Sequence, residues 1–128
     1  MDVNANRRNP EWGGRIVNAE GLRNATAWGK RSAWVNYYGP VEGETLGIAV
    51  LNHPLSFRYP TYWHVRDYGL FAANPFGIND FEKLGVKEAD KKAGRLELKK
   101  GESFTLRYRI LFHMGESDIA GQFEAYRQ

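Results

Sequence analysis

Apolar and polar side chains alternate through residues 103–113, and an extended strand separates such a series onto two faces. One face would carry Phe104, Leu106, Tyr108, Ile110 and Phe112, and the other Thr105, Arg107, Arg109, Leu111 and His113. Residues 95–99 have similar character, and Lys100-Gly101-Glu102 between the two segments has the composition of a turn. The pattern predicts an antiparallel hairpin over residues 95–113.

The remainder of the chain is also typical of strands separated by turns. Seven tyrosines, seven phenylalanines and four tryptophans suit pleated surfaces, and 14 glycines suit tight turns. We predict further strands at residues 15–18, 32–38, 46–51, 62–67 and 70–74. The run 46–51 is continuously apolar, which predicts a central strand that is buried on both faces.

Two segments depart from this strand pattern. Residues 78–94 are polar and charged, so we predict an exposed connection with one loose helical turn, in which disorder is expected. Ser117 is a suitable N-cap, and Ile119, Phe123 and Tyr126 follow at helical spacing. These residues predict a closing helix that packs on the sheet.

A length of 128 residues suits one domain with a single core. We predict a disordered tail at residues 1–14 and one domain at residues 15–128. The fold class expected from these patterns is mainly β with a C-terminal helix.

Several classes of protein are excluded or disfavoured by composition. There is no cysteine, which removes disulfides, thiolate metal sites and cysteine nucleophiles. The net charge of +3 is spread along the chain, which disfavours nucleic-acid binding. The longest apolar run is far shorter than the roughly 20 residues of a membrane span. The polar start lacks the apolar region of a signal peptide. We expect a soluble protein without nucleic-acid or membrane partners, cytoplasmic or periplasmic.

Residues 62–70, Tyr-Trp-His-Val-Arg-Asp-Tyr-Gly-Leu, carry the densest group of chemically useful side chains. Strand alternation places Tyr62, His64 and Arg66 on one face, and Trp63, Val65 and Asp67 on the other. We therefore expect the first three residues at a functional site and Trp63 in the core. Asp67 is a candidate of second rank.

The chain contains three histidines, His53, His64 and His113. If their imidazoles converged, they could hold one divalent metal ion and leave a coordination position open for water or substrate. No local metal-binding spacing supports this hypothesis, so it depends on the fold. In the alternative interpretation each histidine is hydrogen-bonded in a turn or packed on an aromatic ring.

A second hypothesis needs no metal. A histidine could act as general acid and a carboxylate such as Asp67 or Asp80 as base, beside aromatic faces that suit the C–H face of a sugar. Arg66, Arg107 and Arg109 could bind sugar hydroxyls or a carboxylate. The alternatives are that Arg66 and Asp67 form only an ion pair, and that Glu20 and Lys30-Arg31 are solvated turn residues.

Several sequence blocks resemble one family when taken together. They are NAEGLR at 18–23, AWGKR at 27–31, GIAVLNHP at 47–54, WHVRDYGLFAANPFG at 63–77, and GES at 101–103 followed by LRYR at 106–109. This set resembles the bacterial PmoA-like family of uncharacterised proteins, DUF6807. The resemblance covers about residues 15–127 and is to the C-terminal half of the family's members.

The resemblance implies a fold more than an activity. Particulate methane monooxygenase subunits are membrane proteins and this chain has no apolar span, so methane oxidation is not expected. The late hairpin and closing helix resemble the end of a galactose-mutarotase-like supersandwich, which is common in carbohydrate-active proteins. This resemblance implies that the fold is an antiparallel β-sandwich with a C-terminal helix. Half of such a sandwich would leave strand edges unpaired, which favours association with another copy. The resemblance leaves three alternatives: a fragment of a longer protein, a minimal member of the family, or one half of a homodimer.

These arguments give one leading hypothesis and two alternatives. The leading one is a carbohydrate-active or carbohydrate-binding protein for a sugar or sugar acid. Its catalytic candidates are His53, His64, Arg66 and His113, and its substrate-binding candidates are Tyr62, Asp67, Arg107 and Arg109. The alternatives are a non-catalytic assembly or binding domain, and a metal-dependent oxygenase with His53, His64 and His113 as ligands.

Overall fold

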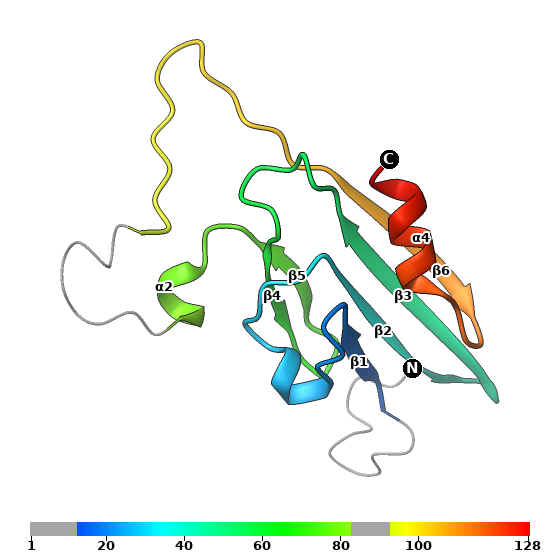
Figure 1. Cartoon of the computed structure of the whole chain (residues 1–128). Helices are drawn as coiled ribbons and strands as arrows, with labels where there is room; N and C mark the ends of the chain where they lie inside the picture. The colour runs from blue at the N-terminus through cyan, green and yellow to red at the C-terminus, as the bar shows by residue number, and fades with distance from the viewer. Residues whose placement is uncertain (1–12, 83–92) are drawn as a thin grey trace.

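The computed structural model describes residues 13–82 and 93–128 (Figure 1). The strands are β1 (Arg15–Asn18), β2 (Trp34–Val41), β3 (Glu44–Asn52), β4 (Tyr62–Val65), β5 (Phe71–Asn74) and β6 (Tyr108–Met114). The helices are η2 (Asn24–Ala27), α2 (Ile78–Phe81) and α4 (Ile119–Tyr126). The described part is mainly β with a C-terminal helix, which confirms that part of the predicted fold class.

The strands form two antiparallel sheets, one of four strands in the order β1-β2-β3-β6 and one of two strands, β4-β5. The hairpin between β2 and β3 turns at Glu42 and Gly43, whose φ angles of 51° and 81° match a two-residue hairpin turn. We predict a strand at residues 32–38, but β2 begins at Trp34 and continues through Gly39-Pro40 to Val41. Proline is tolerated there because β1 pairs with β2 only as far as Tyr38.

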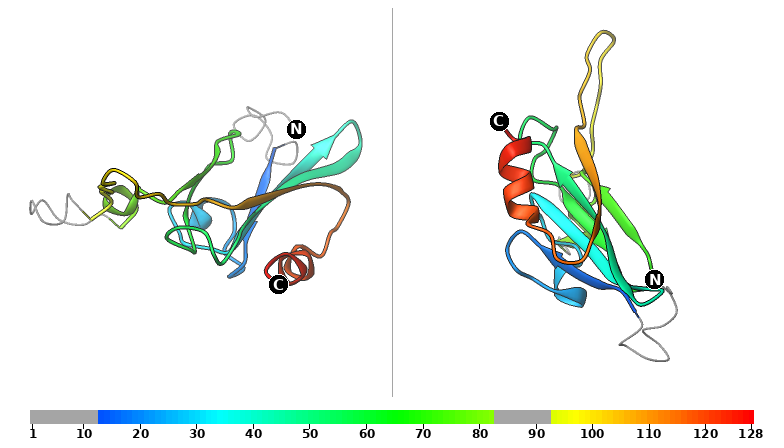
Figure 2. Two further views of the ribbon diagram at one scale, coloured as in Figure 1. Left: turned by 90° about the horizontal axis from the view of Figure 1, so that it is seen from above. Right: turned by 90° about the vertical axis from the view of Figure 1, so that its right-hand side faces the viewer.

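The two faces of the four-stranded sheet have different covers (Figure 2). On one face β4 and β5 cover β1 and β2, in a core that includes Ile16, Val35, Tyr37, Trp63 and Val65. On the other face α4 places Ile119 and Phe123 against Ala49 and Leu51 of β3. A full sandwich and the galactose-mutarotase-like architecture remain predictions, because the second sheet covers only part of one face.

The prediction that residues 46–51 are buried on both faces is wrong. β3 is central, between β2 and β6, and its Ala49 and Leu51 are fully buried beneath α4. Ile48 points the other way and is 40% exposed. Val50, in the same row as Ile48, is only partly buried against the core under β4 and β5. This continuous apolar run therefore contains one buried row and one partly covered row.

The predicted hairpin at residues 95–113 is only partly correct. Its turn exists, since the N–H of Glu102 donates to the carbonyl of Lys99 at 3.0 Å. Its limbs are not a paired ladder, however, and β6 begins at Tyr108 and pairs with β3. Residues 95–107, named the arm below, project from the body in Figures 1 and 2. The N–H of Phe57 donates to the carbonyl of Thr105, so the second limb bonds to the loop after β3 instead.

The closing helix is capped one residue later than predicted. Asp118, not Ser117, is the N-cap of α4, and its carboxylate accepts from the N–H of Gly121 at 2.9 Å. Ile119 and Phe123 are buried on the sheet as the spacing predicts. No helix within residues 13–82 and 93–128 is long and apolar enough to cross a membrane.

Other element predictions have mixed outcomes. β4 ends at Val65, so Asp67 lies in the turn before β5 and not in the strand. α2 supplies the single helical turn expected in the connection at 78–94. The predicted tail at residues 1–14 and the expected disorder in the connection fall largely on residues 1–12 and 83–92, outside the described residues.

Candidate functional site

The central segment separates its side chains as the alternation predicts. Trp63 and Val65 of β4 are buried in the core against β1 and β2. The indole N–H of Trp63 donates to the carbonyl of Ser32 at 2.8 Å, which satisfies its only polar group. Tyr62, His64 and Arg66 occupy the opposite side.

This opposite side is covered by aromatic rings. The His64 ring meets Trp28 and Phe81 edge to face, with centroids 6.0 and 5.8 Å apart. The Arg66 guanidinium lies over Trp28, 4.6 Å from the ring centre. Tyr62 is buried and donates its hydroxyl hydrogen to a Glu82 carboxylate oxygen at 2.9 Å. The three predicted residues therefore share one cluster, and much of their surface is used in packing.

Burial also changes the acidity of four tyrosines. It is the largest cause that raises the pKa of Tyr37, Tyr59, Tyr62 and Tyr108 above the usual value of about 10. For Tyr62 the hydrogen bond to Glu82 raises the pKa further. Tyrosines of the unfolded chain ionise near pH 10, while the pKa of each of these four is higher in the native protein.

We therefore expect stability to fall as pH rises above about 10. The unfolded state loses protons that the native state keeps, so the free energy of unfolding declines through that range. Urea denaturation at a series of pH values measures the decline. The double variant Tyr37→Phe/Tyr62→Phe should show a shallower decline, and an unchanged slope would contradict the assignment.

His53 lies in a different environment, at the end of the sheet beside α4. Its Nδ1 accepts from the N–H of Leu55 at 3.0 Å, and its ring meets Tyr126 edge to face at 4.9 Å. The Arg109 guanidinium lies 4.4 Å from the centre of the same Tyr126 ring. The carbonyl of Arg107 accepts from the N–H of His53 at 3.0 Å. The structure thus joins three of the predicted residues, His53, Arg107 and Arg109, away from the His64 cluster.

His113 lies in a third environment, on β6. Its Nε2 is 2.7 Å from Oδ1 of Asn36 on β2, and its Nδ1 is 3.3 Å from the carbonyl oxygen of Gly115. The strand between β6 and β2 is β3, and His113 is paired there with Gly47. A Cβ at Gly47 would collide with the imidazole. The absence of a side chain at residue 47 therefore lets the ring lie across β3 and reach Asn36.

A polar groove opens beside His113. It has a volume of about 500 Å³ and is lined by Val17, Arg23, Asn36, Tyr38, Thr45, His113, Gly115, Glu116 and Ser117. The Arg23 Nη1 is 3.4 Å from the Tyr38 hydroxyl, and both side chains are at least partly exposed. Hydroxyl, amide, guanidinium, imidazole and carboxylate groups therefore meet in one hollow, on the α4 side of the sheet.

The structure does not bring the three histidines together. Each has its own neighbours, and residues 13–82 and 93–128 contain no group of three or more His, Asp or Glu side chains placed to hold a metal ion. The metal hypothesis needed convergence, and it stays a prediction. Asp67 is exposed in the turn after β4, where its charge raises the pKa of Tyr37.

One comparison with known proteins identifies the family. The family model described as "Family of unknown function (DUF6807)" matches residues 5–126. The chain belongs to the DUF6807 family. Searches of curated proteins and of solved structures found no match. The PmoA-like link and the correspondence to the C-terminal half of longer members are not part of this match and stay predictions.

Some residues of this DUF6807 site were missed by sequence reasoning. Asn36, Tyr38 and Arg23 come from β2 and from the turn before η2, and no local motif connects them with His113. One signal was available: Gly47 is an isolated glycine inside an apolar strand, which often marks a close approach of another group. The residue that approaches Gly47 could not be identified from the sequence, because that requires the register of β6 against β3.

Proposed function

We propose that this DUF6807 domain binds a sugar or sugar acid in the groove beside His113. The observation that carries the proposal is the lining of the groove. Hydrogen-bond donors and acceptors surround a hollow of about 500 Å³, within the size range of small-molecule sites. Sugar hydroxyls both donate and accept, so they suit such a mixed lining.

Two side chains favour a sugar acid within this class. Arg23 is exposed at the groove, and its fork of N–H donors matches a carboxylate. Tyr38 contributes an aromatic ring on which the C–H face of a sugar could lie. A uronate would satisfy both, with its carboxylate toward Arg23 and its ring toward Tyr38.

The contacts of His113 favour binding over catalysis. Both of its ring nitrogens are within hydrogen-bond distance of protein oxygens, on Asn36 and Gly115. An imidazole held in this way is well oriented, but it must release one partner before it can exchange a proton with a ligand. Glu116 supplies a carboxylate in the same groove. We therefore propose recognition as the function and leave turnover out of it.

Titration of the labelled protein with neutral monosaccharides and with uronates, followed by NMR chemical shifts, tests the proposal. We expect at least about tenfold weaker binding for His113→Ala, because the change removes part of the groove wall and the ring that contacts Asn36. The loss of such a contact costs about 1.4 kcal/mol. Arg23→Ala should weaken uronate binding more than neutral-sugar binding. His53→Ala is the matched control, because His53 lies outside the groove, and it should bind normally. Absence of any sugar-induced shift, or an equal effect of His53→Ala, would contradict the proposal.

A second candidate is an assembly domain, and one separate observation favours it. Part of the four-stranded sheet presents apolar side chains that neither β4–β5 nor α4 covers. Exposed apolar patches of this kind often mark interaction surfaces. This face lies on the other side of the sheet from the groove.

A further inference from the structure

An apolar row runs along the arm and β6 on one side of the chain. Its members are Phe104, Leu106, Tyr108, Ile110, Phe112 and Met114, named the stripe below. Phe112 is 79%, Met114 63% and Ile110 58% exposed. In β3 the paired residues Leu46 and Ile48 add to the same side. The stripe carries no charged side chain, so covering it would leave no charge buried without a partner.

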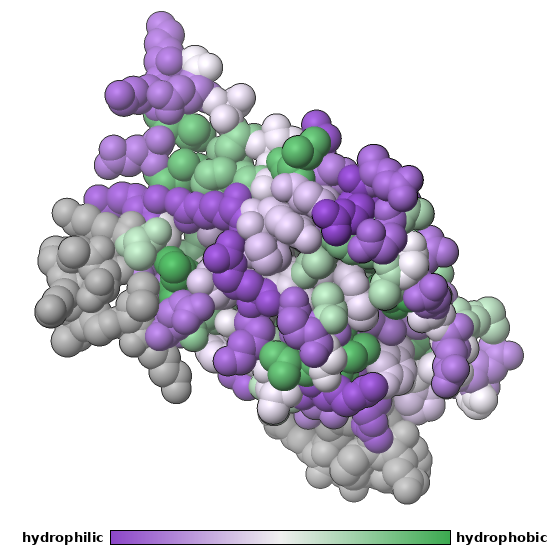
Figure 3. All heavy atoms as spheres, viewed as in Figure 1, coloured by the Kyte–Doolittle hydropathy of each residue, from purple (hydrophilic) through white to green (hydrophobic). Residues whose placement is uncertain are grey.

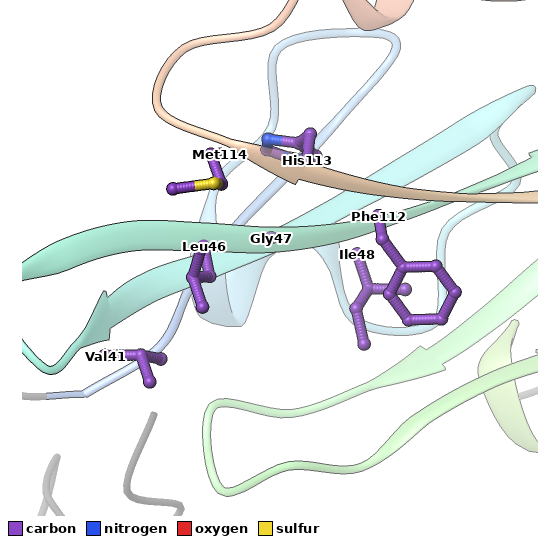
Figure 4. A pocket seen from close by; sticks show the side chains of 7 residues that line it. All are labelled: Val41, Leu46, Gly47, Ile48, Phe112, His113 and Met114. Carbon is purple, nitrogen blue, oxygen red and sulfur yellow. The ribbon is translucent and has the colours of Figure 1, made fainter.

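The uncovered region is a consequence of how the sheets are stacked. Figure 4 shows Leu46, Ile48 and Phe112 pointing to one side of the strands, with His113 on the other. This is the face on which β4 and β5 pack over β1 and β2. An open cavity of about 420 Å³ lies at this part of the sheet. Gly47 and His113 line it together with five apolar side chains, Val41, Leu46, Ile48, Phe112 and Met114. Within residues 13–82 and 93–128, the second layer is therefore present over one half of the sheet and missing over the other.

The arm has the same character beyond the sheet. Figure 3 shows hydrophobic surface on the projecting arm below a hydrophilic tip. Leu98, Phe104 and Leu106 are all exposed, although Phe104 packs in part on Phe57 and Phe76 at the base. Apolar side chains on a projecting segment are unfavourably exposed to water, and packing against another apolar layer would stabilise them.

The size of this surface fits a dimer. With roughly 200 Å² for a fully exposed large side chain, the exposed fractions of the stripe, Ile48 and Leu98 correspond to roughly 700 Å² per copy. The largest apolar patch of a typical monomer is about 300–600 Å². A standard interface buries about 800 Å² on each partner. The patch is thus larger than a monomer usually tolerates and close to what a stable interface needs.

We propose that a second copy of this chain covers the stripe, face to face about a two-fold axis. If the two stripes run in opposite directions with the axis near residue 109, residue 104 of one copy lies opposite 114 of the other, and 106 lies opposite 112. The arm of each copy then lies on the uncovered half of its partner's sheet. One self-complementary contact buries both stripes and closes the assembly, as an isologous interface does.

Light scattering coupled to size-exclusion chromatography of the full chain tests this proposal. We expect the wild type to have twice the monomer mass at micromolar concentration. Phe112→Glu should halve that mass while circular dichroism stays native. Leu55→Glu is the matched control, because Leu55 is 73% exposed but lies outside the stripe, and it should remain dimeric. A monomeric wild type, or a Phe112→Glu protein that is folded and dimeric, would overturn the proposal.

Crosslinking tests the arrangement of the two copies. The chain has no cysteine, so the double variant Leu106→Cys/Phe112→Cys carries the only two thiols. These positions are about 20 Å apart along one extended chain, too far for a short bismaleimide to join within a copy. We expect covalent dimers from the double variant and few from Phe112→Cys alone. Equal yields from both proteins would overturn the stated alignment, and a variant that unfolds is replaced by Leu106→Cys mixed with Phe112→Cys.

Discussion

Trp63→Ala should cost about 3–5 kcal/mol of unfolding free energy, the range measured for truncating buried aromatic residues. Trp63 is almost fully buried on β4, packs on Phe71 of β5, and donates its indole hydrogen to the Ser32 carbonyl. The change removes the ring that joins the small sheet to the large one and leaves a buried carbonyl without its donor. Since domains of this size are stable by about 5–15 kcal/mol, a large part of the margin would be lost.

Urea denaturation followed by circular dichroism measures this loss. Tyr68→Ala is the control, because Tyr68 is an exposed aromatic residue in the turn after β4 and should change stability by less than about 0.5 kcal/mol. Trp63→Phe should lie between the two, since it keeps most of the packing but removes the N–H. Equal midpoints for Trp63→Ala and Tyr68→Ala would show that Trp63 does not hold the layers together.

Gly47→Ala should both destabilise the protein and remove sugar binding at the His113 groove. A Cβ at this residue collides with the His113 imidazole and approaches Cβ of Tyr38 to 3.0 Å. The ring must then leave its place across β3 and lose its bond to Asn36. Inserting a methyl group into a packed site typically costs about 1–3 kcal/mol. Denaturation and NMR titration measure the two effects.

A double-mutant cycle identifies the cause of that cost. In a His113→Ala background the imidazole is gone, so adding Gly47→Ala should cost much less than it does in the wild type. A coupling of about 0.5 kcal/mol or more would place the clash at His113. If Gly47→Ala costs the same in both backgrounds, the effect arises from the strand backbone or from Tyr38 instead.

Local patterns correctly predicted the elements whose apolar face is packed against another element of the same chain. The strand at 15–18 and the packing of Ile119 and Phe123 are observed as predicted, because each depends on short-range periodicity and on a single buried face. The face assignment within β4 was also confirmed, since period-two alternation follows from strand geometry alone.

The wrong predictions concern segments whose apolar side chains are only partly packed against other elements. Leu46 to Leu51 was assigned two buried faces from its composition, yet only the row under α4 is buried. The limb at 95–99 has the sequence of a strand but no ladder partner, so the arm remains an extended loop. Apolar composition indicates that a segment tends to be buried. It does not indicate whether the described part of the chain contains an element that packs over that segment.

The sequence by itself determined a mainly β chain without cysteine, the sides of its strands, and membership of a family of unknown function. Only the tertiary structure decided which polar residues meet. It places the three histidines in three separate environments, and it brings His113 close to Asn36, Tyr38 and Arg23. The physical reason is that strand register brings together residues far apart in the chain, such as 113 and 36, through an intervening glycine that no local pattern connects to either.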